Sequence, residues 1–119
     1  MAVLDDTADI RFLLRIMLER DYIVEDFEDV AALLEFLDRK PCDIIVSDLF
    51  LPNMDGFELV RRLKKNARLS NIPILALTAS ASDETRRRAL AEGFDAYLVK
   101  PYGLDQLLYV VAQYLRNVA

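Results

Sequence analysis

The chain has 119 residues, of which 54% are hydrophobic and 29% are charged, and its formal net charge is −5. This length and composition predict one globular domain over residues 1–119 rather than a disordered segment. The acidic balance argues against direct binding to nucleic acid, which requires clustered lysine and arginine. No apolar run approaches the roughly 20 residues of a membrane span, so we expect no membrane insertion.

Two residue types narrow the possible chemistry. The sequence has no histidine, which excludes imidazole metal ligands and Ser–His nucleophiles. Cys42 is its single cysteine, so no internal disulfide can form, and no secretory signal pattern precedes it. These features predict a reducing, cytoplasmic location. The groups left for chemistry are carboxylates, hydroxyls and lysine amines.

Strand-like and helix-like segments alternate along the chain. Short apolar runs predict strands at residues 3–4, 22–24, 43–47, 73–78 and 95–99. Apolar residues at three- and four-residue intervals predict a helix after each strand. The fourth helix is predicted over residues 82–92. The apolar stripes of the other four are, in chain order, Ile10, Leu13, Leu14, Met17 and Leu18; Val30, Leu33, Leu34 and Leu37; Phe57, Val60 and Leu63; and Leu104, Leu107, Leu108, Val111 and Leu115.

Five strand–helix units predict an α/β fold. The last three strands are continuous apolar runs rather than alternating ones, which is typical of a parallel sheet covered on both faces. Right-handed crossovers then give a doubly wound (βα)5 sandwich of the flavodoxin-like class. Five units are too few for an eight-fold barrel.

Polar residues follow four of the predicted strands: Asp5 and Asp6, Asp48, Thr78, and Lys100. Taken singly, each aspartate is as easily a helix cap or loop residue, Thr78 a strand end and Lys100 a solvated charge. The carboxyl ends of parallel strands, however, share one edge of the sheet, where ligands bind. We therefore predict that these groups form one site.

Carboxylates gathered at one edge repel one another. At about 4 Å and an effective dielectric near 20, each pair costs on the order of 4 kcal/mol. A hard divalent cation such as Mg²⁺, which prefers oxygen ligands, relieves this repulsion. With Lys100 and the Thr78 hydroxyl to bind phosphoryl oxygens, the site suits an aspartate that attacks phosphorus. We predict that Asp48 is this nucleophile.

With these residues in this order, the chain resembles a response-regulator receiver domain over essentially its full length. The matching motifs are Asp5-Asp6, Asp48 in SDLFLPNMDG, Thr78 in LALTA and Lys100 in YLVKPY. The resemblance implies a strand order of 2-1-3-4-5, with the short first strand at the centre. It also implies that Asp48 accepts phosphate from a phosphohistidine of a histidine kinase or phosphotransfer protein.

The resemblance assigns roles to the other residues of the site. Asp6 would bind Mg²⁺ directly and Asp5 through water, with Asp48 and the backbone carbonyl of Phe50 as further ligands. Lys100 would pair with the phosphoryl group, and its bond to Pro101 would be cis.

The resemblance also implies a conformational switch that responds to phosphorylation. The hydroxyl of Thr78 would move toward the phosphoryl oxygen and the ring of Tyr97 would turn inward behind it. Ala79 would leave room beside the acceptor. The predicted helix 82–92 offers only Ala89 and Leu90 as core contacts, so it is easier to shift than its neighbours. We predict that its surface, with the last strand and helix, signals to an unidentified downstream protein.

Two other functions use the same residues. A phosphohydrolase with an aspartyl nucleophile usually has a second acid two residues later, where this chain has Phe50. An interaction domain that is not phosphorylated would be expected to lose the acceptor, the acids or the lysine, and all are present. We therefore predict a regulatory domain rather than an enzyme. Phe12, opposite the apolar stripe of its helix, is a candidate contact for the kinase.

Overall fold

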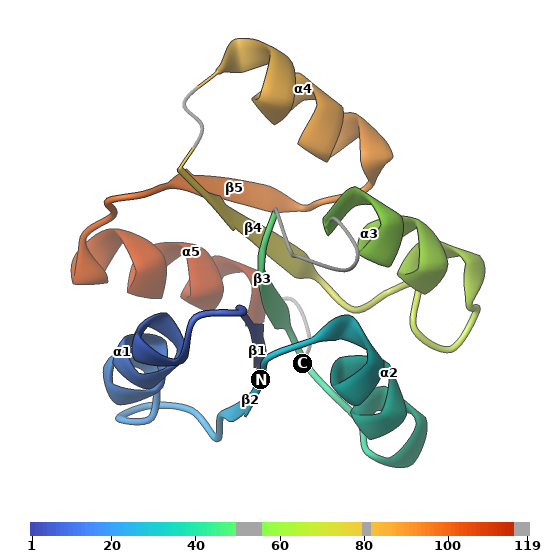
Figure 1. Cartoon of the computed structure of the whole chain (residues 1–119), viewed down its shortest axis with the longest axis horizontal. Helices are drawn as coiled ribbons and strands as arrows, with labels where there is room; N and C mark the ends of the chain where they lie inside the picture. Colours follow the sequence, from blue (N-terminus) through green and yellow to red (C-terminus); the bar gives the residue numbers. More distant parts are fainter. Residues whose placement is uncertain (50–55, 80–81, 116–119) are drawn as a thin grey trace.

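The computed structural model describes residues 1–49, 56–79 and 82–115, and in these ranges strands and helices alternate (Figure 1). The strands are β1 (Ala2–Leu4), β2 (Glu25–Phe27), β3 (Ile45–Asp48), β4 (Ile74–Thr78) and β5 (Ala96–Val99). The helices are α1 (Ala8–Leu18), α2 (Val30–Arg39), α3 (Gly56–Lys65), α4 (Asp83–Glu92) and α5 (Leu104–Leu115). The strands pair in parallel in the order β2-β1-β3-β4-β5, which confirms the predicted fold and strand order.

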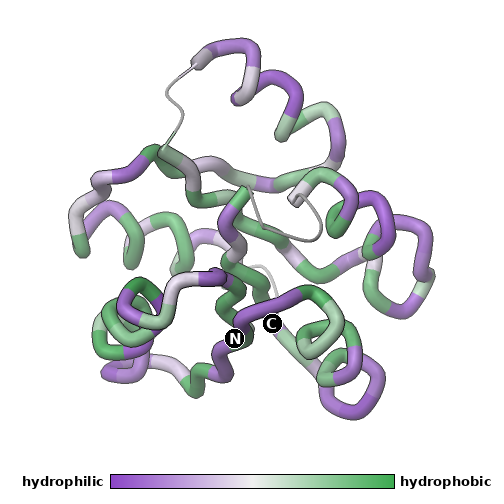
Figure 2. Tube along the Cα trace, viewed as in Figure 1, coloured by the Kyte–Doolittle hydropathy of each residue, from purple (hydrophilic) through white to green (hydrophobic). Residues whose placement is uncertain are grey.

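Helices cover both faces of the sheet. Helices α1 and α5 bury Leu14, Leu18, Leu107 and Val111 on one face. Helices α2 and α3 bury larger sets on the other face, among them Leu33, Leu37, Phe57 and Val60. Successive residues of the central strands point into alternate layers, and helices cover both layers. The central strands are therefore hydrophobic along their length (Figure 2).

Strand β1 holds the site's first carboxylates at the middle of the sheet. Although it has three residues, all of them are buried between β2 and β3. Its register pairs Leu4 with Ser47, so the residue after β1 lies beside the last residue of β3. Asp5 and Asp48 are therefore brought together by strand pairing alone.

Three details of the predicted elements are wrong, and one of them is Leu104 of α5, which was predicted in the buried stripe and is 36% exposed. The second strand is Glu25–Phe27, not residues 22–24, and Ile23 is 86% exposed. β2 is an edge strand with few buried positions, so hydrophobicity does not mark it. On α1, Leu13 is 57% exposed rather than part of the buried stripe, and it lies beside Phe12, whose exposure was predicted.

Helix α4 is attached to the core more weakly than was predicted. Within this fully described helix Ala89 is the one buried residue, and Leu90 is 44% exposed. Figure 2 shows that most of its length is hydrophilic. The helix begins after Ser82, whose hydroxyl accepts the Thr85 N–H, and ends at Gly93, whose φ of 125° a residue with a side chain rarely adopts.

Candidate acidic phosphorylation site

The predicted acidic cluster is present at the carboxyl edge of the sheet. One carboxylate oxygen from each of Asp5, Asp6 and Asp48 lies within 4.8 Å of those of the other two. Asp5 is buried, Asp48 is half-buried and Asp6 is exposed. The cluster thus runs from the interior of the domain to the solvent.

Lys100 reaches the same cluster from the end of β5. Its ammonium nitrogen lies 3.3 Å from Oδ2 of Asp48 and 3.5 Å from Oδ2 of Asp5. The backbone N–H of Lys100 donates to the Thr78 carbonyl at 2.7 Å, which ties the ends of β4 and β5 together. The peptide bond from Lys100 to Pro101 is cis, as the resemblance implied.

The acidic cluster carries three carboxylates against one ammonium. Burial raises the pKa of Asp5, and the Asp48 charge adds to this, while the Thr7 N–H and the Lys100 ammonium act in the opposite direction. Burial and the charges of Asp5 and Asp48 also raise the pKa of Tyr102 to about 12. A buried carboxylate is costly unless cations or hydrogen bonds compensate it. Three oxygen-donor side chains, two of which also contact the Lys100 ammonium, therefore fit an added hard cation such as Mg²⁺.

The remaining predicted residues lie around this edge. Thr78 is fully buried at the end of β4, and Ala79 after it is exposed. Tyr97 is half-buried on β5, opposite Ala76, and packs against the layer formed with α2 and α3. Pro101 is exposed beside Lys100.

The carbonyl of Phe50, predicted as a metal ligand, lies outside the described residues. The residues that flank this segment are nevertheless closely joined. The N–H of Gly56 donates to the carbonyl of Leu49 at 2.6 Å, and a β-carbon at position 56 would lie 2.8 Å from the same oxygen. Glycine is required here because the first residue of α3 lies against the backbone of Asp48 and Leu49 at the end of β3.

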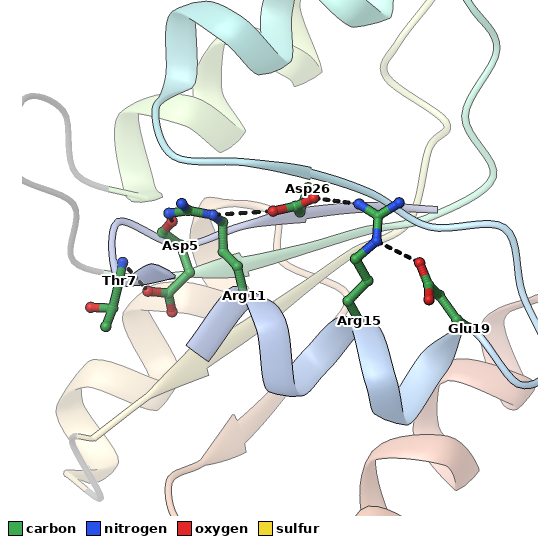
Figure 3. A network of polar contacts seen from close by, with 6 residues as sticks. All are labelled: Asp5, Thr7, Arg11, Arg15, Glu19 and Asp26. Carbon is green, nitrogen blue, oxygen red and sulfur yellow. Dashed lines mark hydrogen bonds and ion pairs between the residues drawn. The ribbon is translucent and has the colours of Figure 1, made fainter. Parts of the chain in front are cut away.

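Sequence reasoning missed a group of charged residues behind the site. Figure 3 shows Arg11 between Asp26 of β2 and the backbone of Asp5. Neither Arg11 nor Asp26 belongs to a recognisable sequence motif. Because the second strand was predicted at residues 22–24, Asp26 fell in a predicted loop. Tyr102 was missed as well, although it directly follows Lys100 and Pro101 in the motif.

Comparison with known proteins decides the family. The sequence model described as "Response regulator receiver domain" matches residues 1–112. The chain belongs to the response regulator receiver domain family. Receiver domains are regulatory, phospho-accepting domains of two-component signalling; they generally bind Mg²⁺ at an acidic site and work with histidine kinases or phosphotransfer proteins.

Two relatives match nearly the whole of this chain. The chain is 42% identical to an uncharacterised 14.6 kDa protein of Leptolyngbya boryana, over 94% of this chain and 86% of that one. It is 35% identical to the phosphate regulon transcriptional regulatory protein PhoB of Rhizobium meliloti, over 98% of this chain and 52% of PhoB. The receiver domain thus spans about half of that regulator.

Solved structures match the receiver fold closely. The chemotaxis response regulator CheY4 of Vibrio cholerae superimposes with a TM-score of 0.88 at 31% identity, covering 96% of each chain. None of the helices in the described part of the receiver domain is long and apolar enough to span a bilayer.

Proposed function

We propose that this receiver domain is a switch in which Asp48 accepts a phosphoryl group from a phosphohistidine of a histidine kinase or phosphotransfer protein. The observation that carries the proposal is the convergence of three carboxylates and the Lys100 ammonium at one sheet edge. Asp48 is the half-buried member, accessible to a donor yet adjacent to the lysine.

In the transfer step, a carboxylate oxygen of Asp48 attacks the donor phosphorus. The new O–P bond forms as the N–P bond to the donor imidazole breaks, and its electron pair stays on the nitrogen. Lys100, 3.3 Å from Asp48 Oδ2, is placed to balance the charge of the phosphoryl oxygens. The hydroxyl of Thr78, at the adjacent strand end, would bind one of these oxygens.

Asp5, Asp6 and Asp48 would hold Mg²⁺, with the carbonyl of Phe50 as the further predicted ligand. A bound divalent ion would supply positive charge to the transferring phosphoryl group and relieve the repulsion among the carboxylates. The donor set supports this assignment because all of its side chains offer hard oxygen atoms.

The readout would use the α4 side of the domain. Movement of Thr78 toward the phosphoryl group would leave room for the ring of Tyr97 to turn inward, and the exposed methyl of Ala79 would not obstruct the acceptor. The weak attachment of α4, through Ala89, supports a shift of this helix toward the downstream protein. A change from 1:99 to 99:1 would require about 5.5 kcal/mol of differential stabilisation.

The decisive experiment compares wild type, Asp48→Asn and Asp43→Asn with a small phosphodonor and Mg²⁺. We expect wild type and Asp43→Asn to gain the mass of one phosphoryl group and Asp48→Asn to gain none. Asp43 is an exposed residue just before β3, so it controls for a general loss of charge. Phosphorylation that persists in Asp48→Asn would refute the assignment of the acceptor.

A second measurement tests whether the domain is regulatory rather than a phosphohydrolase. We expect no steady turnover of small phosphomonoesters, because position 50, where phosphohydrolases with an aspartyl nucleophile usually have a second acid, is phenylalanine. Turnover at several per second, on the order of ordinary enzymes, would reverse this conclusion. The cytoplasmic location and the absence of nucleic-acid binding stay predictions from the sequence.

A further inference from the structure

Besides the contact of Lys100 with Oδ2 of Asp5, three hydrogen bonds hold the turn that carries the first two carboxylates. The N–H of Asp5 donates to the Phe27 carbonyl at 3.1 Å. Its side-chain Oδ1 accepts the N–H of Thr7 at 2.8 Å. Its backbone carbonyl accepts Nη1 of Arg11 at 2.7 Å. The first two contacts are backbone donations, whereas the third depends on one side chain.

Arg11 supplies a donor that the sheet does not provide. In a parallel ladder the N–H and C=O of one residue face the same neighbouring strand. β2 ends at Phe27, where it meets the N–H of Asp5, and the chain then enters α2 through its cap residue Asp29. The carbonyl of Asp5 lies past the last ladder pair, and the guanidinium of Arg11 binds it there.

Arg11 is itself held in place from β2. Its Nε lies 3.2 Å from Oδ2 of Asp26, and the two side chains are 15% and 29% exposed. The neighbouring Arg15 binds the other oxygen of Asp26 and also Glu19, but no contact joins it to the turn of Asp5 (Figure 3). Arg11 and Arg15 thus both bind the carboxylate of Asp26, and of these two only Arg11 also binds the carbonyl of Asp5.

We propose that Arg11, anchored on Asp26, is a positioning residue for the cation pocket, by which we mean the proposed Mg²⁺ site between the carboxylates of Asp5, Asp6 and Asp48. The carbonyl that it binds belongs to the peptide between Asp5 and Asp6, so its orientation sets the directions from which both side chains approach the pocket. Loss of the guanidinium frees this peptide to rotate and spreads the carboxylates. The inference rests on the proposed function, because it requires the pocket to bind Mg²⁺.

The test measures Mg²⁺ affinity directly, without phosphorylation. Amide NMR signals of wild type, Arg11→Met and Arg15→Met are followed during titration with MgCl₂. Methionine keeps an apolar stem and removes the guanidinium in both variants. We expect Arg11→Met to bind Mg²⁺ about 10-fold more weakly, as is typical when a residue that orients metal ligands is lost. Arg15→Met should bind as wild type does.

Arg11→Lys provides a rescue. One ammonium can donate to the Asp5 carbonyl but cannot reproduce the guanidinium fork that also binds Asp26, so we expect an intermediate affinity. If Arg11→Met does not fold, the Mg²⁺ titration of Arg11→Lys tests the proposal instead. Weaker Mg²⁺ binding at an unchanged melting temperature then supports positioning, and unchanged binding overturns it.

Three results would overturn the proposal. Arg11→Met could bind Mg²⁺ as tightly as wild type, which shows that the carbonyl contact does not matter. Both methionine variants could weaken binding equally, which indicates general loosening of α1. Wild type could bind no Mg²⁺ at all, which refutes the cation pocket of the proposed function and this inference with it. In that last case, whether Asp48 is the phosphoacceptor is still decided separately, by the phosphorylation of wild type and Asp48→Asn.

Discussion

The two sides of the proposed phosphorylation site are held by different forces. On one side α1 buries Leu14 and Leu18 completely and adds the charged contacts of Arg11 and Arg15 to β2. On the other side α4 buries Ala89 alone. Local stability follows buried apolar contact, so the carboxylate turn rests on a rigid element and the proposed readout on a weakly held one.

Helix α4 depends instead on polar contacts with α3. Arg61 forms two hydrogen bonds with Glu92, at 2.7 and 2.9 Å. The guanidinium of Arg88 lies 3.9 Å from the centroid of the Phe57 ring. Phe57 is buried in the core, so Arg88 packs on its outer face. Such contacts are weaker than burial and are reduced by salt, which suits a helix that changes position.

Matched leucine truncations test the comparison with the largest expected effect. Leu14→Ala removes a buried side chain from α1 and should lower the free energy of unfolding by about 2–5 kcal/mol. Leu90→Ala, on the exposed part of α4, should change it by less than about 0.5 kcal/mol. Urea denaturation measures both. Equal losses would show that α4 is as firmly attached as α1.

A glycine pair examines the junction of α4 with β5. Gly93→Ala forces a side chain into a φ of 125° and within 3.1 Å of Lys64, so we expect a cost of about 1–3 kcal/mol. Gly103→Ala meets nothing within 4 Å and should be tolerated. Thermal unfolding compares the two. An unaffected Gly93→Ala variant would mean that this junction adjusts without strain.

Helix caps offer a finer comparison between the two halves of the domain. Asp29 accepts the Ala32 N–H at the start of α2, and Ser82 accepts the Thr85 N–H at the start of α4. Asp29→Ala should lower global stability by about 1 kcal/mol. Ser82→Ala should instead speed hydrogen exchange within α4 while leaving the melting temperature nearly unchanged, because α4 opens locally. Loss of global stability in Ser82→Ala would contradict local opening.

The smallest expected effect concerns pH. The hydrogen bonds from Arg61 lower the pKa of Glu92 below its ordinary value. The contact therefore stabilises α4 above the ordinary glutamate pKa and is lost as pH falls through the lowered one. In Arg61→Gln, the Glu92 pKa measured by NMR should return upward toward its ordinary value. High salt should shift the wild-type value in the same direction, and a salt-independent value would argue against an ionic contact.

The sequence predicted much of the site because parallel strands bring their carboxyl ends to one edge. Once five strand–helix units were recognised, Asp5, Asp48 and Lys100 had to converge, whatever the details of the loops. The second strand was misplaced because the apolar run Tyr22–Val24 is more strand-like than the edge strand Glu25–Phe27 that pairs with β1. Edge strands bury few side chains, so hydrophobic pattern does not locate them.

The sequence by itself determined the order of elements, the two-layer burial and the set of chemical groups, because periodicity and strand ends are local properties of the chain. The tertiary structure decided which charges support those groups. Arg11 reaches Asp5 and Asp26 only because β2 pairs in one register with β1 and ends at Phe27. Contacts of this kind depend on where strands stop relative to one another, which no local pattern of residues records.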